Sequence, residues 1–179
     1  MKRRLLLRHL LPALFLGKSV ILHAEVFLTT DKVKAIFFPD EKLTEKTITL
    51  TADQRKAIQK ASGVRVREDK VTAWKSASGG WLIIDNVVGK HEFIDFALAL
   101  KADGSVKGVE ILTYRETYGG EVRNPKWRAQ FSGKTVDAPL KIDSDIKNIS
   151  GATLSSVHMT EGVKRLLHTY TIALKPLAS

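Results

Sequence analysis

The sequence predicts an α+β protein: a mainly antiparallel sheet with flanking helices and a long C-terminal helix. Large apolar residues alternate along 92–100, and an Asp103-Gly104 turn leads into a second run at 106–114, which is typical of a β-hairpin. The last segment of the chain carries apolar residues at helical spacing. Further helical patterns precede and follow the strands instead of alternating with them. This order favours antiparallel over parallel strands.

The composition indicates one globular domain. The chain has 179 residues, of which 44% are hydrophobic, so wholesale disorder is excluded. It contains no cysteine, which excludes disulfides, thiolate metal sites, iron–sulfur clusters and c-type haem. The histidines show no metal-ligand spacing, so we expect no metal site.

Residues 1–24 have the order of a secretory signal peptide. Five basic residues and no acidic residue accompany the short apolar stretch 10–17. The uncharged run between Arg8 and Lys18 is too short to cross a membrane, which takes about 20 residues. We therefore predict a signal peptide, with an uncleaved N-terminal anchor as the alternative. Either one places residues 25–179 in the periplasm or on the outer face of the cytoplasmic membrane.

The net charge of +10 is shared between this leader and the rest of the chain. Half of it lies in residues 1–24, and the remaining basic residues alternate with acidic ones. A nucleic-acid partner is therefore not expected.

Two helices open the chain after the leader and form an N-terminal helical extension. Val33, Ile36 and Phe37 share one face of a helix that begins after Thr30 and ends at Pro39. Thr51 and Gln54 form a capping-box pattern for a helix over 52–62, which Gly63 ends.

Strands and a final helix follow. Strand-like runs cover 64–67, 70–75 and 81–84, with a turn at Gly79-Gly80, before the hairpin described above. Asn124-Pro125 begins a short helix in which Trp127 and Phe131 lie on one side. The long final helix is expected to begin at Ser155 or Ser156. Its apolar stripe consists of Val163, Leu166, Leu167, Tyr170 and Leu174.

The segment just before this helix holds the candidate site. From composition alone, Ser150, Gly151 and Thr153 fit a turn with a helix cap. The same residues also suit a bound phosphate. Gly151 and Ala152 leave space beside the backbone, and Thr153 presents a hydroxyl where free N–H groups and the helix dipole favour an anion. Ser155 and Ser156 are candidate hydroxyl donors.

The run Ser150-Gly-Ala-Thr153-Leu-Ser155-Ser156 resembles the flavinylation motif of the FMN-binding domain family. The family includes subunits of sodium-translocating NADH:quinone reductase and of ferredoxin:NAD oxidoreductase complexes. In it a Mg²⁺-dependent flavin transferase moves FMN from FAD onto the motif threonine as a phosphoester. The resemblance implies that Thr153 is the acceptor, and that 25–179 form a single FMN-binding domain with the helical extension at its start.

A second similarity lies in the glycine-rich loop after the hairpin. The run Tyr114 to Gly120 resembles the family's Glu-Thr-containing loop, which implies that Glu116, Thr117, Gly119 and Gly120 approach the flavin. Trp127 is either a stacking partner for the flavin or, the interpretation we favour, a core aromatic.

Two positions depart from the family pattern. Lys147 stands where members usually carry Asp, six residues before the threonine, and Asp145 is the available substitute. Tyr118 replaces a proline of the glycine-rich loop. The first departure puts recognition by the transferase in doubt.

These observations predict an exported electron-transfer flavoprotein, a carrier with no catalytic residues of its own. It would shuttle electrons between membrane or periplasmic redox partners. The alternative is an exported non-redox binding module with a degenerate flavinylation motif.

Overall fold

The computed structural model describes residues 25–178. The predicted leader, residues 1–24, lies outside the described residues. Among the described residues, none of the helices has both the length and the apolar character that a membrane crossing requires.

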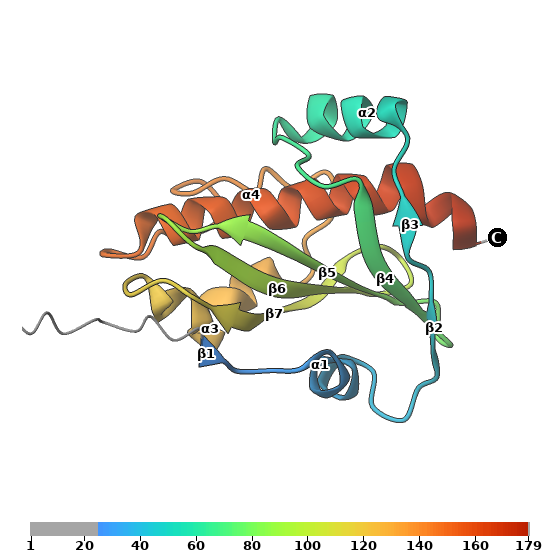
Figure 1. The fold of residues 1–179 in the computed structure, drawn as a ribbon, viewed down its shortest axis with the longest axis horizontal. Coiled ribbons are helices and arrows are strands. Elements are labelled where there is room, and N and C mark those ends of the chain that lie inside the picture. Colours follow the sequence, from blue (N-terminus) through green and yellow to red (C-terminus); the bar gives the residue numbers. More distant parts are fainter. Residues whose placement is uncertain (1–24, 179) are drawn as a thin grey trace, which may run out of the picture.

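A seven-stranded sheet forms the centre of the fold (Figure 1). The antiparallel order is β1-β7-β6-β5-β4-β2, and β3 also pairs with β4. The predicted α+β class with a mainly antiparallel sheet and a long C-terminal helix is confirmed. The strands are β1 (Glu25–Val26), β2 (Leu43–Glu45), β3 (Ile48–Thr49), β4 (Lys70–Ser76), β5 (Trp81–Val88), β6 (Phe93–Leu100) and β7 (Val106–Tyr114).

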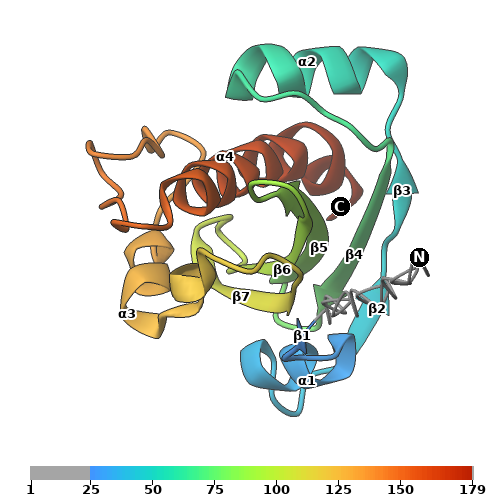
Figure 2. The same cartoon turned by 60° about the vertical axis from the view of Figure 1, so that its left-hand side comes forward.

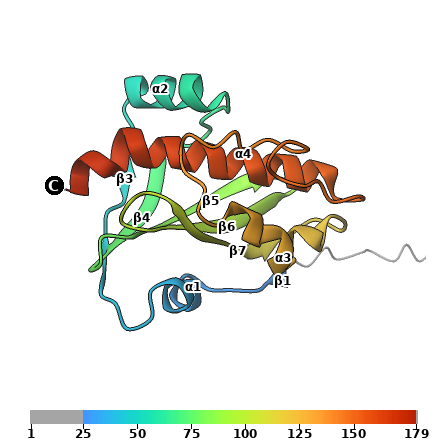
Figure 3. The same ribbon diagram turned by 180° about the vertical axis from the view of Figure 1, so that it is seen from behind.

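Helices cover both faces of this sheet. Figures 1 and 3 show α4 along one face, with α2 outside it, and α1 on the opposite face. Figure 2 shows how strongly the sheet twists beneath α4. The helices are α1 (Thr30–Phe37), α2 (Ala52–Ser62), α3 (Pro125–Arg128) and α4 (Thr153–Thr169), which continues as a π-helical segment, Tyr170–Leu174, and a 3₁₀ turn, Lys175–Ala178. Two further 3₁₀ turns, Gly120–Arg123 and Ala129–Phe131, flank α3.

Residue size along β6 explains why the two faces differ. Ile94, Phe96 and Leu98 point to the α4 side, where the larger apolar core lies. Between them, Ala97 and Ala99 point to the smaller core under α1. The alternation in the sequence therefore encodes a thick core on the side of α4 and a thin one opposite.

The predicted capping box of α2 is present. Gln54 N donates to Thr51 Oγ1 at 3.1 Å, and Thr51 N donates to Gln54 Oε1 at 2.9 Å. Gly63 ends the helix with φ +72°, as a left-handed cap. In α1, Val33 and Phe37 are buried, whereas Ile36, which the sequence pattern groups with them on one face, is exposed.

The strand predicted over 64–67 is absent. These residues form an irregular loop, because β3 already pairs with Val71 and Lys70 at the start of β4. The last helix begins at Thr153, two residues before the earliest predicted start. The short β1, β2 and β3 strands were not predicted, since two or three residues carry no periodicity.

Candidate functional site

Thr153 is the first residue of α4 and is exposed to solvent. Ala152 occupies the N-cap position, where no side chain caps the helix, and the first turn contains no acidic residue. Gly151 has φ +85°, and its two chain neighbours aside, no other heavy atom lies within 4 Å of the position that a Cβ would take. The free N–H end of α4 is therefore open, which is the arrangement that favours an anion next to Thr153.

Asn148 holds the Thr153 hydroxyl. Its Nδ2 donates to Thr153 Oγ1 at 3.3 Å, while its Oδ1 accepts from Ile149 N at 2.8 Å. The bond to Ile149 fixes the orientation of the Asn148 amide and leaves the hydroxyl proton of Thr153 free. This contact could not be predicted from the sequence, because an Asn five residues before a helix start belongs to no periodic pattern.

The two serines of the motif face inward, unlike Thr153. Ser156 is fully buried, and its Oγ donates to Ala152 O at 2.9 Å. Ser155 is buried beside Tyr114, with 3.3 Å between Ser155 Oγ and the Tyr114 hydroxyl oxygen. In this structure neither hydroxyl reaches the surface on which Thr153 lies, contrary to the expectation that both would be available donors. Ser150, by contrast, is exposed.

The glycine-rich loop packs against the first turn of α4. Gly119 has φ +88°, and a Cβ at this position would stand 2.7 Å from Ser155 Oγ and 2.8 Å from the Tyr114 hydroxyl. Only glycine allows this approach. Tyr114 OH also donates to Tyr118 O at 2.5 Å. Burial raises the pKa of Tyr114 above its ordinary value, so the hydroxyl stays protonated and keeps donating.

Glu116 points to a different neighbour, the turn between β5 and β6. Its Oε1 accepts from the backbone N–H of Glu92 at 2.8 Å and from that of His91. Partial burial acts to raise the pKa of Glu116, but the amides of Glu92, His91 and Lys90 outweigh it and lower the pKa. Glu116 therefore clamps the β5–β6 turn, while Thr117 is exposed and Gly120 begins a 3₁₀ turn.

Two large side chains are exposed on the glycine-rich loop and in the first turn of α4. Tyr118 is 82% exposed and Leu154 is 47% exposed. Tyr118 lies one residue from the contact of Gly119 with α4, and Leu154 follows Thr153 directly. Thr153 is also exposed, so the candidate site is a surface with exposed apolar side chains beside the hydroxyl.

Asp145 does not take the place of the acidic residue that Lys147 replaces. Its carboxylate lies 2.8 Å from Lys134 Nζ and accepts from the backbone N–H groups of Lys141 and Leu140. Although partial burial opposes it, these contacts lower the pKa of Asp145. Asp145 organises its own loop, while the Lys147 side chain is exposed.

Trp127 is buried in the core, edge-on to Phe131 with ring centroids 5.3 Å apart. Its Nε1 donates to Lys147 O at 2.7 Å. The interpretation of Trp127 as a core aromatic is thereby confirmed, and the tryptophan anchors the loop that leads to Thr153. Within residues 25–178, no group of three or more His, Cys, Asp or Glu side chains could hold a metal ion.

Comparisons with known proteins point to the same region. The model of the FMN-binding domain family matches residues 89–168, from the β5–β6 turn into α4. The chain is 37% identical over 76 residues to one subunit of the Na⁺-translocating NADH-quinone reductase of Vibrio vulnificus, covering 33% of this chain and 30% of that protein. It is 33% identical over 110 residues to one subunit of the proton-translocating ferredoxin:NAD⁺ oxidoreductase complex of Clostridium ljungdahlii, covering 55% of this chain and 60% of that protein. The match therefore spans less than two thirds of the length of either relative.

Two solved structures share the fold. The crystal structure of NqrC from Shewanella oneidensis superposes with a TM-score of 0.56 at 15% identity, covering 83% of this chain and 89% of that one. A subunit of the Na⁺-translocating NADH-quinone reductase from Parabacteroides distasonis gives 0.50 at 14% identity, covering 80% and 84%. The sheet and the long C-terminal helix agree with these two structures in fold, and it is the segment 89–168 that matches the model of the FMN-binding domain family.

Proposed function

We propose that this chain is an exported electron-transfer flavoprotein that carries FMN as a phosphoester on Thr153. The proposal rests chiefly on one observation: an exposed threonine hydroxyl at the open, uncapped N-terminus of α4. Two of the relatives are subunits of redox complexes, which supports a role as an electron carrier with membrane or periplasmic partners.

The residues present fit a nucleotide phosphate. The open backbone N–H groups of the first turn of α4 would face the phosphate, with no acidic side chain in that turn to oppose it. The exposed faces of Tyr118 and Leu154 would carry part of the ring system. FMN supplies the transfer of one or two electrons. The protein holds the cofactor at an open surface, where a redox partner can reach it.

Attachment requires a flavin transferase with FAD as the co-substrate. A bond forms between Thr153 Oγ1 and the phosphorus of the FMN half, the pyrophosphate bond of FAD breaks, and AMP leaves. The hydroxyl proton of Thr153 is lost in this step. Asn148 acts as a positioning residue, since its amide holds Oγ1 without taking that proton.

The decisive experiment is co-expression of the full chain with a flavin transferase, followed by acid denaturation and intact-mass measurement. The wild-type chain should keep its yellow colour in the pellet and gain the mass of FMN less one water. Thr153→Ala should gain nothing. Thr44→Ala, which removes an exposed threonine hydroxyl on the edge strand β2, should be modified like the wild type. An unmodified wild-type chain would favour the non-redox binding module instead.

Export and the place of action are part of the same proposal. The basic and apolar pattern of residues 1–24 supports delivery to the periplasm or to the outer face of the cytoplasmic membrane. A covalent tether suits that location, because a cofactor lost outside the cytoplasm cannot readily be replaced. Fractionation of cells producing the full chain would test this, with the cytoplasmic fraction as the contradicting result.

A further inference from the structure

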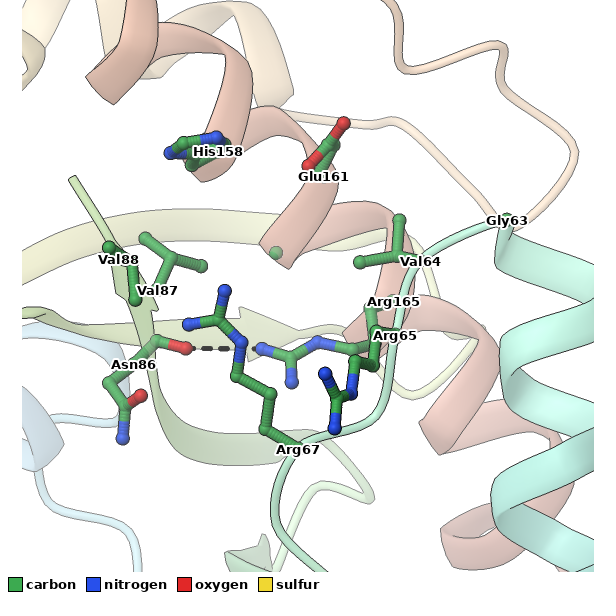
Figure 4. Close-up of a pocket in the computed structure, with 11 residues that line it drawn as sticks. Gly63, Val64, Arg65, Arg67, Asn86, Val87, Val88, His158, Glu161 and Arg165 are labelled. Carbon is green, nitrogen blue, oxygen red and sulfur yellow. Dashed lines mark hydrogen bonds between the residues drawn. The ribbon is translucent and has the colours of Figure 1, made fainter. Parts of the chain in front are cut away.

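A separate hollow lies along the middle of α4, away from Thr153. It has a volume of about 190 Å³ and is bounded by α4, the end of β5 and the loop that follows α2 (Figure 4). The loop side and the β5 side of this hollow precede residues 89–168, the segment that matches the family. The hollow is thus formed between the family domain and the N-terminal part of this chain.

Three guanidinium groups line the hollow. Arg65 and Arg67 come from the loop, and Arg165 comes from α4 (Figure 4). Arg65 and Arg67 are exposed, and within residues 25–178 neither makes a hydrogen bond or an ion pair. Two positive charges therefore face the hollow without being engaged in an ion pair among the described residues.

Arg165 is different, because only 7% of it is exposed. Its Nη2 lies 2.8 Å from Asp85 Oδ2 and donates to Asn86 O at 3.1 Å. Its Nε is buried and has no acceptor among the described residues. Asp85 balances the charge of Arg165 but leaves its hydrogen-bonding capacity incomplete. Such an unpaired buried donor points to a further polar partner.

The remaining polar groups limit where an anion can sit. Glu161 lines the hollow from α4, on the side opposite to Arg65 and Arg67 in Figure 4. The Nδ1 of His158 is already 2.9 Å from Gly89 O. Val64, Val87 and Val88 supply apolar wall. An anion would therefore be held on the loop side by the two arginines, with room for a small organic portion against the valines.

We propose that this hollow binds a phosphate-type dianion, free or as a phosphomonoester, through the guanidinium groups of Arg65 and Arg67. The planar guanidinium fork matches phosphate oxygens in pairs, and two such groups balance two negative charges. A volume near 190 Å³ exceeds that of a lone phosphate and leaves space for a small attached group. The site is independent of Thr153 and of the proposed flavin tether.

The test is calorimetric titration of the full chain with inorganic phosphate, with chloride used to keep the ionic strength constant. We expect saturable binding. An Arg65→Gln/Arg67→Gln variant should lose roughly tenfold or more in affinity, as expected for charge-assisted hydrogen bonds. Arg55→Gln is the matched control, since Arg55 is exposed on α2 outside the hollow. Arg65 and Arg67 lie on the loop after α2 and not at Thr153, so a failed flavin tether would leave this result unchanged.

Removal of the negative charge of Glu161 should raise the affinity for phosphate, whereas removal of the two arginines lowers it. Glu161→Gln should tighten phosphate binding, because Glu161 is the carboxylate that lines the hollow. Three results would overturn the proposal: no saturable binding at millimolar phosphate, equal weakening by Arg55→Gln, or a Glu161→Gln change that leaves affinity unchanged or weakens it.

The source of the phosphate is settled by comparing three probes. These are inorganic phosphate, FMN, and vesicles containing phosphatidate, each titrated into the wild type and the double arginine variant. The natural ligand belongs to the class of the probe that binds the wild type more tightly than inorganic phosphate does. In the double arginine variant, that probe should bind no more tightly than inorganic phosphate. Equal binding of every probe by both proteins would contradict the site.

Discussion

The first turn of α4 and the middle of the same helix contrast in almost every physical respect. At the first turn, Thr153 is exposed, the backbone N–H groups lack a side-chain cap, and Leu154 stands open. In the middle, Gly162 and Arg165 press against β5 and β6, and Arg165 pairs with Asp85. The same helix is therefore tightly packed in its middle and uncapped at its N-terminus. A helix can therefore leave the backbone N–H groups of its first turn uncapped when the rest of the helix is firmly packed.

The largest effect on stability should come from Arg165→Leu, which leaves the Asp85 carboxylate buried without its partner. We expect a loss of about 3–5 kcal/mol in the free energy of unfolding, measured by urea at pH 7. Burial already raises the pKa of Asp85 above 3.8, so the buried acid is less costly when protonated. Because the folded-state pKa of Asp85 is raised, the loss of stability in Arg165→Leu should be largest above that pKa. It should become smaller as the pH falls and Asp85 is protonated.

The matched control removes both charges. An Asp85→Leu/Arg165→Leu double variant should recover most of the stability lost by the single change. If it is as unstable as Arg165→Leu at neutral pH, the penalty does not come from an unpaired carboxylate.

Gly162→Val should have the next largest effect, because the helix lies too close to the sheet for a side chain. A Cβ at this position would stand 2.6 Å from Val87 Cγ1 and 3.1 Å from Phe96 Cζ. Overpacking of this kind costs about 1–3 kcal/mol. Glu161→Val, at the exposed neighbouring position, carries the same β-branched side chain and should cost much less by urea unfolding. Equal losses would show that the close approach is unimportant.

At the N-terminus of α4, in contrast to the two destabilising changes above, an added negative charge should stabilise the fold. Thr153→Asp places a negative charge at the N-terminus of the helix and should stabilise the protein by about 0.3–1 kcal/mol at low salt. It should also abolish flavin attachment. Thr153→Asn, which is uncharged, should share the loss of attachment without the salt-dependent gain. A destabilised Asp variant would argue against an open, anion-favouring helix end.

The smallest and most local effect should come from Glu116→Gln. The pKa of Glu116 is lowered in the folded state, so its contribution to the clamp is present above its ordinary pKa of 4.5 and lost as the pH falls through the folded value. Hydrogen exchange at the His91 and Glu92 amides should be faster in the variant near neutral pH and similar to the wild type in acid. Glu121→Gln, an exposed neighbour, should leave both amides protected.

The parts of the fold that sequence could predict were those with long or repeated signals. The alternation along 93–100, the Thr51–Gln54 capping box and the stripe of α4 each bury a regular face, and the structure confirms them. The irregular loop at 64–67 was misassigned, because Val64 and Val66 alternate with arginines just as strand residues do. What decides between strand and loop there is whether a partner strand is free, and that is a property of the tertiary structure.

For the candidate site, the sequence located the segment but not the direction of each side chain. Thr153 at the mouth of a helix was readable from small residues and hydroxyls before an apolar stripe. The inward orientation of Ser155 and Ser156 depends on Tyr114 and on the backbone of Ala152, which no local pattern reveals. Likewise, the role of Glu116 at the β5–β6 turn arises from residues about 24 positions away in the chain.

The outer strands of the sheet also affect how the protein resists aggregation. β1 and β3 contain two residues each and β2 contains three, and they cover the outward edges of β7 and β4. Such short edges give a second molecule little backbone to pair with, which discourages edge-to-edge aggregation. Concentrated solutions of the protein should therefore resist polymerisation through the sheet edges.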